Sequence, residues 1–124
     1  MNNMEKNDCV FCKIIAGVIK AEKVGDYEDF IVINDAHPVT EGHCLIIPKR
    51  HFSTLLDLPS TLGSELLKIA KDQSLRLIKE GKAKGIKLGQ NNFKEAGQAV
   101  MHFHLHVIPF KEYSEKLWKK ADNA

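Results

Sequence analysis

Short apolar runs, rich in β-branched and aromatic residues and bounded by turn-forming residues, predict five strands along the chain. These are residues 22–27, 29–35, 42–49, 85–91 and 101–110. Pro48 and Pro109 are expected to end the third and fifth strands, because proline cannot donate a hydrogen bond to a neighbouring strand. A sheet is therefore the main element that the pattern predicts.

Residues 60–80 follow a different period, with apolar side chains at spacings of three and four that are typical of a helix packed against a core. The predicted buried face comprises Leu62, Leu66, Ile69, Ala70, Gln73 and Leu77, broadened by Leu67, Leu75 and Ile78. Ser60 is expected to cap this helix at its start and Gly81 at its end. A short helical turn is predicted at residues 12–17, closed by Gly17. Strands gathered around one long helix indicate an α+β domain with a mainly antiparallel sheet.

Composition and charge narrow the class of protein. The 124 residues suit a single domain, 44% of them are apolar, and 18 basic against 16 acidic residues leave a net charge of +2. That balance argues against nucleic acid or a membrane as the partner, and no apolar run approaches the ~18 residues that span a bilayer. The polar N-terminal segment MNNMEKND does not resemble a signal peptide, so a cytoplasmic location is predicted. Three cysteines in such a protein favour metal binding or burial over disulfides.

Three of the 6 histidines alternate with apolar residues in the segment MHFHLHVIPF. In a strand, His102, His104 and His106 would line one face, and Met101, Phe103, Leu105 and Val107 the other. One interpretation is an exposed strand face that happens to be histidine. A second is a catalytic zinc site with all three as ligands, but three such positions span about 13 Å, which is too far for one tetrahedral ion unless the strand bends.

A third interpretation is nucleophilic catalysis. A neutral imidazole titrates near about 6.5 and attacks electrophiles such as phosphorus, while a neighbouring imidazole protonates the leaving group. The preceding loop, residues 91–98, offers backbone N–H groups and amide side chains to phosphate oxygens, with ordinary loop hydrogen bonding as the alternative. Candidates for the walls of a purine pocket, with core packing as the alternative, are Phe30, Val32 and Ile33.

Cys9 and Cys12 form a C-x-x-C pair. The pair fits half of a zinc site, a redox pair or two buried thiols. A redox pair usually accompanies a thioredoxin-like βαβ pattern, which this sequence lacks, and a zinc site needs two further ligands. Cys44, within a predicted strand, is interpreted as a small buried apolar residue.

Three ordered segments resemble the histidine triad (HIT) family, and the third contains its signature. HFHLHVI matches its signature of three histidines separated by single apolar residues. VINDAHPVTEGHCLIIPKRH is similar to its second segment, GQNNFKEAGQAVMHFHLHVIP to its third, and CVFCKIIAG to the N-terminus of many bacterial members. The resemblance covers about residues 9–110 and leaves 111–124 as a short tail. It implies a single HIT domain over 1–124, with a mainly antiparallel five-stranded sheet, one long helix and short helices.

The resemblance also implies an activity. Family members are nucleotide hydrolases or transferases that act at the α-phosphate of nucleoside phosphoramidates or dinucleoside polyphosphates, through a covalent nucleotidyl-histidine. The implied substrate is a purine nucleotide such as an AMP derivative. The implied catalytic residues are His104 as the nucleophile, His106 at the α-phosphate and His43 assisting both. The implied substrate-binding residues are Asp35 at the ribose hydroxyls and Asn91, Gly97 and Gln98 at the phosphate. From the residues alone, an Asx turn is an equal interpretation for Asp35.

A structural zinc is implied as well, with no catalytic metal required. Bacterial relatives with the same N-terminus use a ligand set that corresponds to Cys9, Cys12, His51 and His102. Such a closed tetrahedron would join the N-terminal turn to the sheet. Family members are typically homodimers, which implies a homodimer here. The alternative function is a purine nucleotide-binding or interaction module with little physiological turnover.

Overall fold

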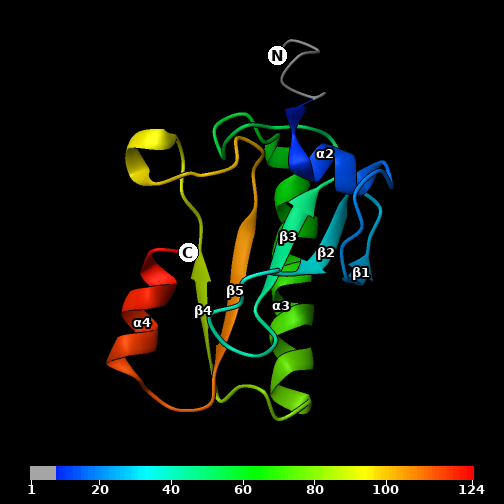
Figure 1. Ribbon diagram of the computed structural model, residues 1–124. Coiled ribbons are helices and arrows are strands. Elements are labelled where there is room, and N and C mark those ends of the chain that lie inside the picture. Colours follow the sequence, from blue (N-terminus) through cyan, green and yellow to red (C-terminus); the bar gives the residue numbers. More distant parts are fainter. Residues whose placement is uncertain (1–7) are drawn as a thin grey trace.

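The computed structural model of the chain describes residues 8–124, which are built around a five-stranded antiparallel sheet (Figure 1). The strands are β1 (Lys23–Asp26), β2 (Phe30–Asn34), β3 (Cys44–Pro48), β4 (Gly85–Gly89) and β5 (Leu105–Phe110). They lie in the order β1-β2-β3-β5-β4. The helices are α2 (Val10–Ile15), α3 (Gly63–Lys79) and α4 (Glu115–Asp122), with 3-10 turns at Ser60–Leu62 and Lys94–Ala96. The predicted α+β class, with one long helix and short helices, is confirmed.

The sequence also predicted that the chain carries no signal peptide and no membrane-spanning segment. The inference that MNNMEKND is no signal peptide rests on residues that, apart from Asp8, lie outside the described range. Within residues 8–124, no helix combines the length and the apolar character that crossing a membrane requires.

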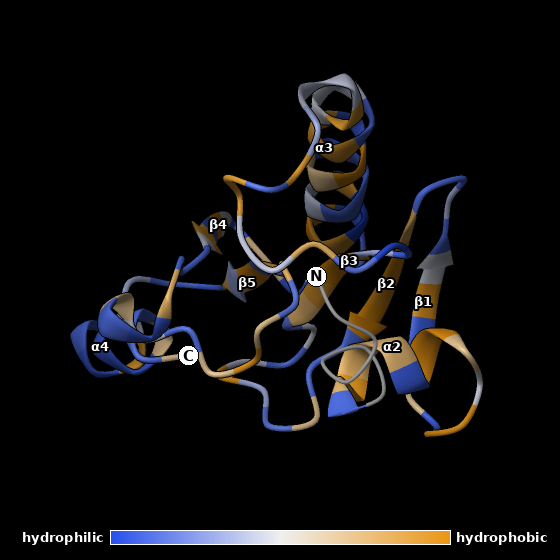
Figure 2. Cartoon of the chain, turned by 90° about the horizontal axis from the view of Figure 1, so that it is seen from above, coloured by the Kyte–Doolittle hydropathy of each residue, from blue (hydrophilic) through white to orange (hydrophobic). Residues whose placement is uncertain are grey.

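Both faces of the sheet are covered, which explains why β2 and β3 are apolar at consecutive positions. One cluster joins α3 to the sheet through Phe30, Val32, Cys44, Ile46, Ile69, Leu77 and Val107. The other joins α2 to the sheet through Cys9, Phe11, Ile31, Ile33, Leu45 and Ile47. Figure 2 shows α3 on one side of the sheet and α2 on the other. The chemistry-bearing residues gather on the α2 side.

The long helix differs from the prediction in its start and in the width of its buried face. Ser60 lies inside the 3-10 turn and does not cap the helix, which begins at Gly63. Gly81 follows the helix with a left-handed φ of 76°, as expected. Ile69, Ala70, Gln73 and Leu77 are buried, whereas Leu67, Leu75 and Ile78 are 59%, 55% and 46% exposed. The prediction that these three broaden the buried face is wrong, because the helix meets the sheet along a narrow stripe.

The histidine strand begins later than predicted, at Leu105. The neighbouring strand β3 ends at Pro48, which has no N–H to donate across the pair. The carbonyl oxygen of Pro48 instead accepts a hydrogen bond from Nε2 of His102 at 2.9 Å. Residues 101–104 therefore leave the sheet, and Met101, which was expected on the apolar face of the strand, is 43% exposed.

The tail beyond residue 110 is attached to the sheet by α4, which the sequence did not predict. Leu117 and Ala121 of this helix pack in a cluster with Ile108 of β5. Trp118 is partly exposed, and Nζ of Lys87 lies 4.6 Å from the centroid of its ring, in cation–π contact. The helix thus lies beside the edge strand β4 (Figure 1).

Gly42 precedes His43 and the start of β3 at a position that cannot accept a side chain. Its φ is +99°, and a Cβ there would lie 2.8 Å from Cδ2 of Leu77. We expect Gly42→Ala to lower the free energy of unfolding by about 2 kcal/mol, because the backbone must change or α3 must move. Gly63→Ala is the matched control, because Gly63 has helical backbone angles and open space around it. That variant should gain about 0.5 kcal/mol. Urea unfolding measures both, and a Gly42→Ala protein as stable as the wild type would contradict the prediction.

Candidate active site and metal centre

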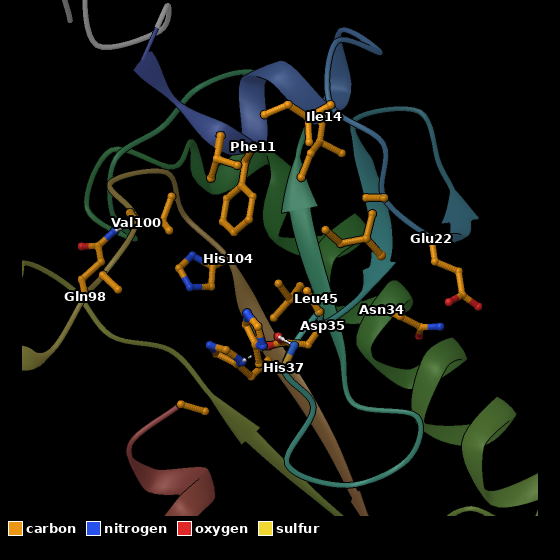
Figure 3. A pocket seen from close by; sticks show the side chains of 18 of the residues that line it. Phe11, Ile14, Glu22, Asn34, Asp35, His37, Leu45, Gln98, Val100 and His104 are labelled. Carbon is orange, nitrogen blue, oxygen red and sulfur yellow. Dashed lines mark hydrogen bonds and ion pairs between the residues drawn. The ribbon is translucent and has the colours of Figure 1, made fainter.

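A cleft of about 740 Å³ lies on the α2 side of the sheet (Figure 3). Leu45 of β3 pairs with both Ile33 of β2 and His106 of β5, so these three side chains share one face of the sheet. Phe11 and Ile14 of α2 line the cleft from the other side. The predicted site residues that line it are Asp35, Asn91, Gly97, Gln98, His104 and His106.

His104 is held with one ring nitrogen available for reaction. Its Nδ1 lies 2.8 Å from the carbonyl oxygen of His102, which can only accept, so Nδ1 carries the proton and Nε2 keeps its lone pair. The ring of Phe11 packs edge-on against the imidazole, with centroids 5.1 Å apart. Burial lowers the pKa of His104, which keeps the ring neutral at neutral pH. A neutral imidazole with a lone pair in a cleft can act as a nucleophile.

A chain of hydrogen bonds gives His106 the opposite tautomer to that of His104, with the proton on Nε2. The backbone N–H of Val39 donates to Nδ1 of His43 at 3.0 Å, so the proton of His43 lies on Nε2. That Nε2 lies 2.9 Å from Nδ1 of His106 and 3.4 Å from Oδ2 of Asp35. Nδ1 of His106 therefore accepts, and Nε2 of His106 carries a proton. Burial lowers the pKa of His43, and lowers that of His106 to about 4. The rings of His104 and His106, 5.1 Å apart, thus offer a lone pair and a donor.

The two carboxylate oxygens of Asp35 have different partners: one is bonded within a turn, and the other faces the histidines. Oδ1 accepts a hydrogen bond from the backbone N–H of His37 at 2.9 Å, which is the Asx turn that the sequence allowed. Oδ2 faces His43 and lies 3.9 Å from Nδ1 of His106. Asp35 also lines the cleft, so its second oxygen retains acceptor capacity toward a ligand.

Gln98 fastens the loop before β5. Its Oε1 accepts from the backbone N–H of Phe93 at 2.6 Å, and its Nε2 donates to the carbonyl oxygens of Ser53 and Val100 at 2.6 and 3.0 Å. These bonds hold Phe93 at a φ of 73°, which residues with side chains rarely adopt. Ordinary loop hydrogen bonding therefore occupies this side-chain amide.

Asn91 and Gly97 border the same cleft, and neither is tied to the loop by side-chain hydrogen bonds as Gln98 is. The carboxamide of Asn91 is half-buried, and within residues 8–124 it makes no hydrogen bond. Gly97 adopts a left-handed φ of 93° that lets the loop turn toward the cleft. Of the three residues expected near a phosphate, Asn91 thus supplies the amide that remains available.

The apolar candidates for a base pocket separate into two groups. Phe30 and Val32 are fully buried in the cluster under α3, as core packing requires, whereas Ile33 lines the cleft. Sequence reasoning did not identify Phe11 and Ile14 as the facing wall. The position of Phe11 between the two cysteines could have identified it, because a metal ion bound by both cysteines also holds Phe11 beside the sheet.

Cys9, Cys12, His51 and His102 form a second constellation. Sγ of Cys9 and of Cys12 lie 3.3 and 3.5 Å from Nδ1 of His102, and Sγ of Cys12 lies 3.2 Å from Nδ1 of His51. Bonds of about 2.3 Å to sulfur and 2.0 Å to nitrogen around a tetrahedral zinc give sulfur–nitrogen edges of about 3.5 Å. Because Nε2 of His102 donates to Pro48, its Nδ1 lone pair faces the sulfurs. The four residues therefore fit a zinc ion.

The three alternating histidines do not converge on one ion within residues 8–124. The ring of His102 faces the cysteines, while Nδ1 of His104 is bound to a carbonyl oxygen. This geometry argues against a catalytic zinc with all three as ligands. Asp35, His43 and His106 also bring ligand atoms within 4.8 Å of one another, but the proton on Nε2 of His43 lies between them. We therefore interpret these three residues as a hydrogen-bonded group that shares a proton, and not as a metal site.

Known proteins resemble this chain in sequence. The family model described as HIT domain matches residues 16–113. An uncharacterised HIT-like protein of Mycoplasma genitalium is 42% identical over 112 residues, covering 86% of this chain and 77% of that protein. An adenosine 5′-monophosphoramidase of Saccharomyces cerevisiae is 39% identical, covering 84% and 63%. An adenylylsulfatase of Arabidopsis thaliana is 37% identical, covering 91% and 57%. The chain thus spans less than two thirds of both enzymes.

Solved structures resemble it in fold. A HIT family protein from Bacillus anthracis matches with a TM-score of 0.81 and 38% identity, covering 88% of this chain and 76% of that one. A zinc-bound histidine triad family protein from Mycobacterium smegmatis matches with a TM-score of 0.76 and 33% identity, covering 90% and 81%.

Proposed function

The chain belongs to the HIT domain family, and from this membership we propose that it is a hydrolase or transferase acting at the α-phosphate of a nucleotide. The proposed substrates are nucleoside phosphoramidates or dinucleoside polyphosphates with a purine base, such as AMP derivatives, and the product is a nucleoside monophosphate. Relatives that include an adenosine 5′-monophosphoramidase and an adenylylsulfatase support this reaction class. A homodimer, a single domain over 1–124 and a cytoplasmic location stay predictions.

The observation on which the proposal rests is the pair of opposite tautomers at His104 and His106. The carbonyl oxygen of His102 holds the proton of His104 on Nδ1, so its Nε2 is a nucleophile. The chain from Val39 through His43 leaves a proton on Nε2 of His106. One ring thus attacks phosphorus while the next donates to a phosphate oxygen, which is the pairing that phosphoryl chemistry requires.

In the first step, Nε2 of His104 attacks the α-phosphorus and forms a P–N bond. The bond from phosphorus to the leaving group breaks, and the leaving group departs with the bonding electrons and takes up a proton from solvent. His106 donates from Nε2 to a nonbridging α-phosphate oxygen, where negative charge increases in the transition state. Asn91 donates to the phosphate from the loop, and Asp35 accepts from the ribose hydroxyls with Oδ2.

In the second step, water attacks the same phosphorus and the P–N bond breaks. The nucleoside monophosphate leaves, Nε2 of His104 recovers its lone pair, and the proton from water passes to solvent. Transfer to another acceptor replaces water with that acceptor. A zinc ion at Cys9, Cys12, His51 and His102 would join α2 to the segment before β5 and takes no part in either step.

Incubation with adenosine phosphoramidate and, separately, with a diadenosine polyphosphate tests the proposal. We expect AMP as a product from at least one of them. Mass spectrometry after a rapid denaturing quench at alkaline pH should find one nucleotidyl group on the peptide that contains His104. Nucleotide binding with neither product nor adduct would contradict the enzyme and support the alternative of a nucleotide-binding module.

A further inference from the structure

The cleft continues from the histidines across the sheet toward β1. His106 pairs with Leu45, and Leu45 pairs with Ile33, so the floor of the cleft crosses β5, β3 and β2 in order. With strands about 4.8 Å apart, the distance from β5 to β1 is about 14 Å. If the phosphate lies at the histidines and the ribose at Asp35, the base therefore lies over Leu45 and Ile33. The edge of the base then faces the segment that leads into β1.

That segment and its neighbour place three polar side chains at the far end of the cleft: Lys20, Glu22 and Asn34. Figure 3 shows Glu22 and Asn34 across the apolar residues from His104 and Gln98. The carbonyl oxygen of Glu22 accepts from the backbone N–H of Asn34 at 2.9 Å, which fixes this segment to β2. Within residues 8–124, none of the three side chains makes a hydrogen bond or an ion pair. In Figure 3 the carboxylate of Glu22 and the carboxamide of Asn34 extend away from the apolar residues of the cleft. The side chain of Glu22 is exposed and has no partner among the described residues, so it can rotate toward a ligand in the cleft.

Resting on the proposed nucleotide chemistry, we infer that Glu22 and Lys20 recognise the Watson–Crick edge of the base and make the cleft favour guanine nucleotides over adenine nucleotides. Guanine presents two adjacent donors, N1–H and the 2-amino group, beside the acceptor O6. A carboxylate accepts from both donors at once, and an ammonium group donates to O6.

Adenine fits the same side chains less well. It has an amino donor at the position of O6, which would oppose the ammonium group of Lys20, and it has no 2-amino group for Glu22. The apolar floor at Leu45 and Ile33 and the facing wall at Phe11 hold either purine by its faces, so they do not distinguish the two bases. Discrimination therefore rests on the polar end of the cleft.

Calorimetric titration of the full chain with GMP, IMP and AMP tests this inference. Because Glu22 and Lys20 are exposed to water, we expect GMP to bind about fivefold more tightly than AMP. IMP, which keeps N1–H and O6 but lacks the 2-amino group, should fall between them. Glu22→Gln should reduce the preference for GMP over AMP to about twofold, because Lys20 still donates to O6. Glu28→Gln, an exposed glutamate outside the cleft, is the matched control and should keep the wild-type ratio.

The outcomes separate this inference from the function on which it rests. If none of the three nucleotides binds, the proposed function fails. If AMP binds as tightly as GMP or more tightly, or if Glu22→Gln weakens all three nucleotides equally, the inference is overturned and the proposed function stands. An unchanged ratio in Glu22→Gln also overturns it. Circular dichroism verifies the fold of both variants.

Discussion

Replacing His104 by alanine should lower turnover at least about 10³-fold while nucleotide binding survives. The loss is large because no other described side chain in the cleft is a neutral ring whose Nδ1 proton is held by a carbonyl oxygen, leaving the lone pair on Nε2. Binding should persist, since the cleft floor, Asp35 and Asn91 remain in place. Steady-state assays with the preferred phosphoramidate or dinucleoside polyphosphate measure turnover, and titration with the product nucleotide measures binding.

His37→Ala is the control for this prediction. His37 is an exposed histidine at the cleft, and only its backbone N–H interacts with Asp35. We expect this variant to keep most of the wild-type turnover and to form the nucleotidyl adduct, while His104→Ala forms none. Wild-type turnover in a correctly folded His104→Ala protein would refute the covalent mechanism.

Replacing Cys12 by serine should release zinc and destabilise the fold. Protein purified without chelator should contain about one zinc per chain, and the variant should contain little. The free energy of unfolding should fall by about 4 kcal/mol or more, because ligands brought together from α2, from the segment after β3 and from the segment before β5 would lose their common bond. Metal analysis and urea unfolding measure the two effects. Brief exposure of the wild type to a chelator should leave turnover intact, since no step of the proposed reaction uses the metal.

Cys44→Ala separates loss of this site from loss of any cysteine. Cys44 is fully buried on the α3 side of the sheet, away from the four ligand residues. That variant should keep its zinc and lose about 1 kcal/mol from the smaller side chain. If the metal-free wild-type protein has the same unfolding curve as the zinc-containing protein, the structural role of zinc is refuted. The proposed catalysis does not depend on that result.

The sequence predicted which strands and helices form better than it predicted where they begin and which of their residues are buried. The apolar runs predicted the five strands, and the helical period over residues 60–80 predicted the long helix. They did not show that Leu67 and Leu75 are exposed, because the same residues at the same spacing suit a wide or a narrow contact, and the sheet decides the width. The late start of β5 depends on a hydrogen bond between His102 and Pro48, 54 positions apart.

The candidate site shows the same division. The alternating histidines and the C-x-x-C pair identified residues able to perform the chemistry, and the family resemblance suggested their roles. The proton positions on His104 and His106 could not be predicted, because they depend on a carbonyl oxygen in a bent segment and on a backbone N–H reached through His43. The commitment of the Gln98 amide to the loop likewise depends on Ser53, 45 positions away.

His102 has consequences for how such sequences change over generations. Its ring faces the two cysteines and its carbonyl oxygen orients the reactive imidazole two positions later. A lineage that loses one cysteine gains little from keeping the other or His51, so we expect the set to be inherited or discarded together. In a lineage that discards the set, the residue at position 102 must still place its carbonyl oxygen against the reactive ring, so we expect that position to keep a side chain that fills the same space.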